Sequence, residues 1–153
     1  MRALLDTSVL IGELPPLDDV EAAISVASIT ELHFGVLVCD DDDERARRTA
    51  RLAVVEATFD PLPVGVEVAR LWGQLAAAVA RRGGNPRRRQ IDLVIAATAQ
   101  VEGVPLFTEN VGDFKIIDDL VDVRRLSDQS AADIRAGAEP TSSREDIMGP
   151  SEG

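Results

Sequence analysis

The chain has 153 residues, a length that suits a single domain with a hydrophobic core of its own. Hydrophobic residues make up 45% and charged residues 28%, which is typical of a globular protein and excludes general disorder. No apolar run approaches the ~20 residues that cross a bilayer. An acid at position 6 interrupts the N-terminus before a signal-peptide core can form, so we expect a cytoplasmic protein with no membrane partner.

Two residue types occur only once, and their scarcity excludes several kinds of site. A single cysteine, Cys39, excludes an intrachain disulfide framework and a zinc site built on several thiolates. A single histidine, His33, excludes catalysis by paired imidazoles. The net charge of -11, taken alone, argues against nucleic acid as a partner, but the distribution of charge along the chain decides this question.

In chain order, strand-like and helix-like segments alternate, which predicts an α/β fold with a mostly parallel sheet. Strands are expected at residues 3–5, 24–26, 104–107 and 121–123, with an irregular edge strand at 59–64. Helices are expected at residues 28–38, 44–57, 66–82 and 89–102.

Local sequence signals set some of these boundaries. Ser28-Ile29-Thr30-Glu31 fits a capping box that opens a helix. The acidic run at residues 40–44 fits a solvated loop followed by a helix start. Residues 127–153 contain six acidic and two basic residues and little that could form a core face. We therefore expect an ordered domain over residues 1–126 and an acidic, disordered tail over 127–153.

Acidic residues follow several of the predicted strands. Asp6 ends the first strand, Glu31 lies just after the second, and Asp113 comes shortly after the strand at 104–107. The carboxyl ends of parallel strands share one edge of a sheet, so these acids should converge there. Asp92 stands near the start of an apolar helix, where a carboxylate on a packed face needs a partner. Mg²⁺ or Mn²⁺, which prefer oxygen ligands, would relieve the repulsion in such a cluster.

Each of these residues also has a purely structural interpretation. Asp6 and Glu31 are suited to helix capping, Asp92 to the positive end of a helix dipole, and Asp113 to a turn. The arginines at positions 81, 82, 87, 88 and 89 form a concentrated basic patch. They fit a helix end with a solvated loop, or a surface that positions phosphates beside the acids.

Four segments in this order resemble the four motifs of PIN-domain nucleases, in the small single-domain form of the VapC toxins of bacterial type II toxin–antitoxin modules. They are residues 4–11 (LLDTSVLI), 28–35 (SITELHFG), 92–99 (DLVIAATA) and 108–114 (TENVGDF). The resemblance implies a three-layer α/β/α fold and an endoribonuclease that depends on Mg²⁺ or Mn²⁺. It also implies inhibition by a cognate VapB antitoxin, and it suggests a homodimer.

The resemblance assigns roles to particular positions. Asp6, Glu31, Asp92 and Asp113 would be the catalytic acids, with the metal on Asp6, Asp92 and Asp113. Thr7 and Asn110 would be polar supports, with local backbone hydrogen bonding as the competing interpretation for both. Glu109 is an extra acid in the fourth motif, so the fourth ligand could be shared or reassigned. The arginine patch (Arg81, Arg82, Arg87, Arg88 and Arg89) becomes a candidate contact for RNA or for an acidic antitoxin segment.

Other functions compete with the toxin hypothesis. The same fold and chemistry would serve a housekeeping RNA-processing nuclease without an antitoxin. A nucleic-acid-binding module without catalysis would not need four converging carboxylates. A phosphoacceptor signalling domain would need adjacent acids after the first strand, whereas Asp6 is followed by Thr7 and Ser8.

Overall fold

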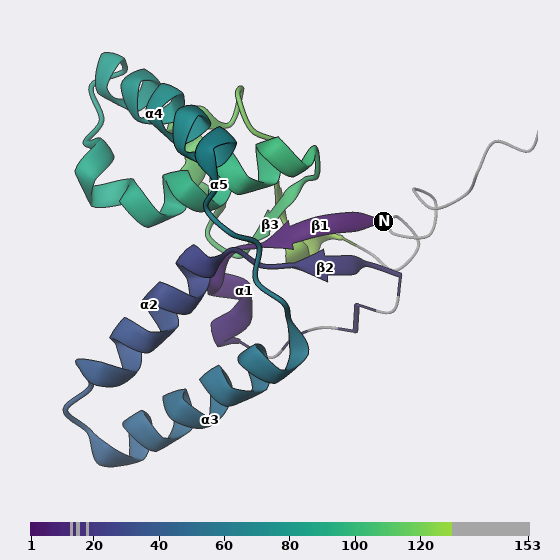
Figure 1. The fold of residues 1–153 in the computed structure, drawn as a ribbon, viewed down its shortest axis with the longest axis vertical. Helices are drawn as coiled ribbons and strands as arrows, with labels where there is room; N and C mark the ends of the chain where they lie inside the picture. Colours follow the sequence, from purple (N-terminus) through teal and green to yellow (C-terminus); the bar gives the residue numbers. More distant parts are fainter. Residues whose placement is uncertain (13, 15, 18, 130–153) are drawn as a thin grey trace, which may run out of the picture.

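Figure 1 shows the computed structural model, which describes residues 1–129 except 13, 15 and 18. Its sheet has four strands in the order β2-β1-β3-β4, and every neighbouring pair is parallel. The strands are β1 (Arg2–Leu5), β2 (Glu21–Ala23), β3 (Leu106–Thr108) and β4 (Val123–Arg125). The predicted α/β class with a parallel sheet is confirmed, and all four strands end at the same edge.

Helices cover both faces of this sheet and complete three layers (Figure 1). On one side lie α1 (Thr7–Ile11), α2 (Val26–Leu37) and α3 (Asp42–Thr58), and on the other α4 (Val66–Arg81) and α5 (Gln90–Glu102). Three 3₁₀ segments complete the described part: η1 (Pro86–Arg89), η2 (Val111–Ile117) and η3 (Leu126–Asp128).

The central strands feed two cores because successive side chains of a strand point to opposite faces. Leu4 and Leu106 pack into the cluster formed with α4 and α5. Leu5 and Phe107, each the next residue along its strand, pack with α1 and Val55 of α3 in the other cluster. All four strand residues are fully buried, so the sheet is a rigid support for whatever follows its carboxyl edge.

The acidic run at residues 40–44 begins α3 as expected. Asp41 caps the helix, accepting a hydrogen bond from the Glu44 amide at 2.7 Å. Asp42, Asp43 and Glu44 lie in the first turn, where negative charge suits the helix dipole. Figure 1 shows α2 and α3 packed side by side and extending away from the sheet.

Two predictions around the second strand are wrong. β2 occupies residues 21–23, and Ile24 follows it as a fully buried residue. α2 begins at Val26, because the Ser25 hydroxyl accepts a hydrogen bond from the Ala27 amide at 3.1 Å. The expected capping box is therefore absent: Ser28 lies inside the first turn of α2.

The segment at residues 59–64 is also not the expected edge strand. Within it, Leu62 makes an isolated parallel bridge to Ser25. The last two strands lie about two residues later than predicted, and Arg89 belongs to η1 rather than to the helix that follows. The long helices are otherwise confirmed within a few residues.

Within residues 1–129, apart from the gaps noted above, no helix is long and apolar enough to cross a membrane. Of the predicted acidic tail at 127–153, only residues 127–129 lie within the described part, so the domain boundary at 126 stays a prediction.

Candidate active site

Asp6 lies between β1 and α1, and a pair of hydroxyl groups fixes its carboxylate. Asp6 Oδ2 accepts hydrogen bonds from Ser8 Oγ at 2.7 Å and from Thr108 Oγ1 at 2.9 Å. Ser8 Oγ in turn accepts the Glu109 amide and Thr108 Oγ1 accepts the Asn110 amide, both at 3.0 Å. These amide donors direct the two hydroxyl protons toward Asp6. The carboxylate is thus oriented by β3, although it also serves as the N-cap of α1.

Glu31 reaches this site from the second turn of α2. Its carboxylate is half-buried, and burial together with the charge of Asp6 raises its pKa, although a hydrogen bond from Thr7 opposes the rise. Thr7 Oγ1 also lies 3.2 Å from Ser28 Oγ, within hydrogen-bond distance. Thr7 and Ser28 are buried, so polar side chains join α1 to α2 next to Asp6.

Asp92 is placed by α5, whose next seven residues are all buried. Burial raises the pKa of the Asp92 carboxyl to about 7, with further contributions from the negative charges of Asp6, Asp113 and Glu31. The nearby guanidinium of Arg89 opposes this rise. The fold therefore brings Asp6, Asp113 and Glu31 within electrostatic range of Asp92.

The Asp113 side chain is more exposed than that of Asp92, and Arg89 forms an ion pair with both. Arg89 Nη1 lies 3.7 Å from Asp113 Oδ1 and 4.0 Å from Asp92 Oδ2. The same group donates to the Asp113 carbonyl oxygen. One member of the predicted arginine patch therefore belongs to the acidic site itself.

The remaining residues of the fourth motif have structural contacts. Glu109 Oε1 accepts a hydrogen bond from the Ser127 amide at 3.1 Å, so this extra acid contacts η3. Asn110 is exposed and precedes η2, and its carbonyl accepts the Asp113 amide at 3.0 Å. A supporting role for the Asn110 side chain stays a prediction.

A metal ion would have to find its ligands among these carboxylates. In the described part of the chain, no three Asp, Glu, His or Cys side chains already surround one point as ligands. The donor set nevertheless fits Mg²⁺ or Mn²⁺, because it consists only of oxygen atoms. Burial, together with the negative charges of Asp6, Asp113 and Glu31, raises the pKa of Asp92, so added positive charge would favour its ionised form.

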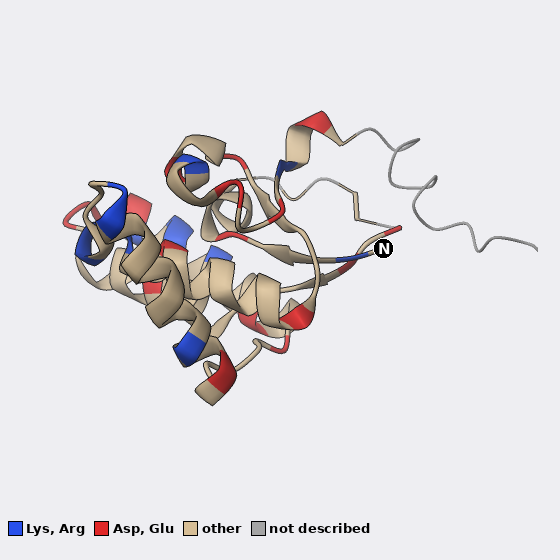
Figure 2. Ribbon diagram, turned by 90° about the horizontal axis from the view of Figure 1, so that it is seen from above, with Lys and Arg blue, Asp and Glu red and all other residues tan. Residues whose placement is uncertain are grey.

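The sequence-predicted arginine patch divides into separate roles. Arg82 forms a two-pronged ion pair with Asp119, at 2.6 and 3.0 Å. It also donates to the Ile116 carbonyl, which holds η2 against the end of α4. Arg81, Arg87 and Arg88 are exposed. Figure 2 shows that basic and acidic positions are interspersed over the ribbon rather than separated into two halves.

Several functional features were missed from the sequence. Ser8 and Thr108 support Asp6 more directly than the predicted residues do, and Ser8 stands in the quoted first motif. A second group of arginines on α3, at positions 47, 48 and 51, lines a cavity beside Thr7 and Glu31. Their clustering in the sequence, RARRTAR at 45–51, was the available signal. His33 instead pairs with Glu56 at 3.1 Å and joins α2 to α3.

Comparison with known proteins identifies the family of this chain. Residues 3–120 match the PIN domain family. Ribonuclease VapC5 of Mycobacterium tuberculosis is 38% identical over 122 residues, covering 75% of this chain and 87% of that protein. Ribonuclease VapC4 of the same species is 33% identical over 115 residues, covering 71% of this chain and 86% of that protein.

A solved structure supports the same conclusion. The crystal structure of VapBC-5, a toxin–antitoxin system of Mycobacterium tuberculosis, aligns with a TM-score of 0.68 and 36% identity. The alignment covers 81% of this chain and 96% of that one. The resemblance inferred from the four motifs is thereby confirmed. The chain belongs to the PIN-domain family and is homologous to the VapC ribonucleases.

Proposed function

We propose that this protein is the toxin of a toxin–antitoxin pair and hydrolyses RNA phosphodiester bonds with Mg²⁺ or Mn²⁺. The observation that carries this proposal is the electrostatic interaction of Asp92 with Asp6, Glu31 and Asp113, which come from separate segments of the chain. A half-buried carboxyl whose pKa rises to about 7 near three other acids is a site that favours a bound cation.

Each acid contributes differently. Asp6, Asp92 and Asp113 would hold the cation, with Asp6 fixed in orientation by Ser8 and Thr108. When bound, the cation polarises water and neutralises charge that develops on the phosphate. Glu31, whose pKa is raised by burial, is thereby a better proton acceptor than an ordinary carboxylate.

The partner proposal has a separate basis. The solved relatives include a member of a family of toxin–antitoxin systems, VapBC-5 of Mycobacterium tuberculosis. We therefore infer a VapB-like antitoxin as partner of this chain. A homodimer also stays a prediction, which light scattering of the purified toxin tests.

The activity is tested by cleavage of RNA with and without metal. Cleavage should stop in EDTA and return with Mg²⁺ or Mn²⁺. Asp6→Asn and Asp92→Asn should each reduce the rate at least about 100-fold, because each removes one carboxylate with little change in volume. Asp60→Asn is the matched control, since Asp60 is exposed and lies outside the site.

Two results would contradict the proposal. Full cleavage in excess chelator would exclude the metal mechanism. Wild-type rates in both site variants would show that the acids were assigned wrongly, provided that circular dichroism confirms that both variants fold.

A further inference from the structure

A cavity of about 570 Å³ adjoins the acidic site between α1, α2 and α3. Thr7 and Glu31, which belong to the site, also line this cavity, so the two spaces are continuous. Ile11 and Leu32 supply apolar wall. The wall contributed by α3 contains the three arginines at positions 47, 48 and 51.

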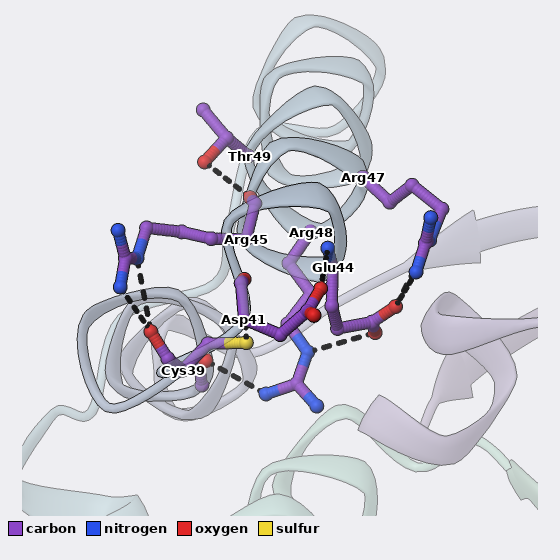
Figure 3. A network of polar contacts seen from close by, with 8 residues as sticks. Cys39, Asp41, Glu44, Arg45, Arg47, Arg48 and Thr49 are labelled. Atoms are coloured by element: carbon purple, nitrogen blue, oxygen red, sulfur yellow. Dashed lines mark hydrogen bonds and ion pairs between the residues drawn. The ribbon is translucent and has the colours of Figure 1, made fainter.

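Glu44 balances part of this positive charge. Figure 3 shows its carboxylate between Arg47 and Arg48, which approach to 2.7 and 3.0 Å and lower its pKa. Arg48 also donates to the Gly35 carbonyl at 2.8 Å and so joins α3 to α2. Arg48 therefore has a structural role that uses both sides of its guanidinium.

Arg47 and Arg51 keep more of their hydrogen-bonding capacity. The Arg47 side chain is 68% exposed, and Glu44 is its ion-pair partner. Arg51 donates to the Gly12 carbonyl. Among the described residues, Arg51 has no carboxylate within ion-pair distance. Three guanidinium groups thus face two carboxylates, Glu31 and Glu44, in the lining of this cavity.

We propose that this cavity binds the nucleotide next to the cleaved phosphodiester bond, an inference that rests on the proposed ribonuclease activity. Arg47 and Arg51 contact its phosphate oxygens, and Ile11 and Leu32 pack against its base or ribose. The volume lies in the usual range for small-ligand sites. An RNA strand that leaves the acids needs positive charge for its next phosphate, and α3 supplies it directly beside Glu31.

The lining of the cavity favours a nucleotide over an apolar protein segment. The large exposed apolar side chains near the end of α2, Phe34, Leu37 and Val38, do not line the cavity. An apolar protein segment would be expected to cover them first. The cavity instead combines guanidinium groups with a small apolar wall, which suits a nucleotide.

The test compares Arg47→Ala with Arg70→Ala, an exposed arginine on α4 that lines no part of the cavity. RNA affinity is measured in an Asp6→Asn background at several salt concentrations. We expect Arg47→Ala to weaken binding about tenfold and to reduce the slope of log affinity against log salt by ~0.7. Arg70→Ala should change neither quantity appreciably.

Truncated RNA substrates show which nucleotide interacts with Arg47. RNAs are shortened step by step on either side of the cleaved bond and assayed with wild-type protein and Arg47→Ala. On one side, removal of the adjacent nucleotide should abolish the difference between the two proteins, as in a double-mutant cycle. A difference that persists in every RNA would overturn the assignment.

Other results separate this inference from the proposed function. If the wild type cleaves RNA but Arg47→Ala behaves like Arg70→Ala, only the cavity assignment is wrong. If Arg47→Ala weakens the antitoxin complex and leaves RNA binding unchanged, the cavity belongs to the protein partner, and the inference is overturned. A wild type that cleaves no RNA with either metal contradicts the proposed function itself.

Discussion

Asp6 and Asp92 occupy contrasting environments within one site. Asp6 accepts hydrogen bonds from two hydroxyls whose own positions are fixed by backbone amides. Asp92 sits on an apolar helix, with Arg89 4.0 Å away as its ion-pair partner. The first arrangement orients a carboxylate, and the second makes ionisation unfavourable until more positive charge arrives.

This difference predicts how stability depends on pH. The native pKa of Asp92, about 7, exceeds its ordinary value of 3.8, so the native state holds the proton more tightly than the unfolded state. The free energy of unfolding should therefore fall as pH rises toward 7 and level off above it. In EDTA we expect Asp92 to account for a loss of about 2 kcal/mol between pH 5.5 and 8.

Urea unfolding of wild type and Asp92→Asn over this pH range measures that contribution. Asp92→Asn should show a flatter dependence, because the group that titrates is gone. If the free energy of unfolding depended on pH in the same way for both proteins, Asp92 would have the same pKa in the native and unfolded states. Asp60→Asn again serves as the control for removal of one acid.

The elements of this fold differ in how far the sequence predicts them. The acidic start of α3 and the glycine end of α5 are local signals, and both elements were predicted within two residues. Gly103 adopts φ 66°, a left-handed conformation that favours glycine. α2 begins at a local serine cap, Ser25, but the sequence offers Ser28 as a second candidate. The contacts that accompany the earlier start are the bridge of Ser25 to Leu62 and the hydrogen bond between Thr7 and Ser28. Such contacts between distant residues leave no local pattern.

The same distinction applies to the site. Asp6, Glu31, Asp92 and Asp113 could be proposed from strand ends and motifs. The support from Thr108 could not, because Thr108 reaches Asp6 across 102 positions of sequence. The ion pair of Arg89 with Asp113 depends likewise on η1 lying against η2, which no periodicity indicates.

One element contact has a direct mutational test. Gly84 follows α4, and a Cβ there would lie 2.6 Å from Ile116 Cδ1 and 2.7 Å from Val79 Cγ1. Ile116 belongs to η2, the segment that carries Asp113. Gly84→Ala should destabilise the protein by about 1–3 kcal/mol and slow RNA cleavage by displacing Asp113.

Gly73→Ala provides the matched control, because no atom lies within 4 Å of the added methyl group. In the interior of α4 it should stabilise the protein by about 0.5–1 kcal/mol. Thermal melting measures the stability of the two variants, and cleavage assays measure their activity. Equal stability of Gly84→Ala and wild type would show that η2 moves aside without cost.

At the scale of the whole molecule, an acidic protein has to attract a polyanion. The chain carries a net charge of -11, and the basic positions are spread among acidic ones (Figure 2). Local groups of arginines must therefore act against the overall field. Two such groups flank the acidic site: the cavity arginines of α3 on one side, and Arg89 with the neighbouring exposed Arg87 and Arg88 on the other.

Removal of residues 130–153 tests this balance together with the predicted domain boundary. The deletion takes away five acids and two arginines and changes the net charge from -11 to -8. It keeps Leu126 in the core and the hydrogen bond between Ser127 and Glu109.

The shortened protein should melt within a few degrees of the full chain and associate with RNA a few-fold faster at ~50 mM salt. Stopped-flow measurement should show that this advantage disappears near ~0.5 M salt, where the Debye length falls below about 5 Å. A large drop in melting temperature would place these residues within the folded domain. An unchanged association rate at low salt would show that their charge does not act on the RNA-binding surface.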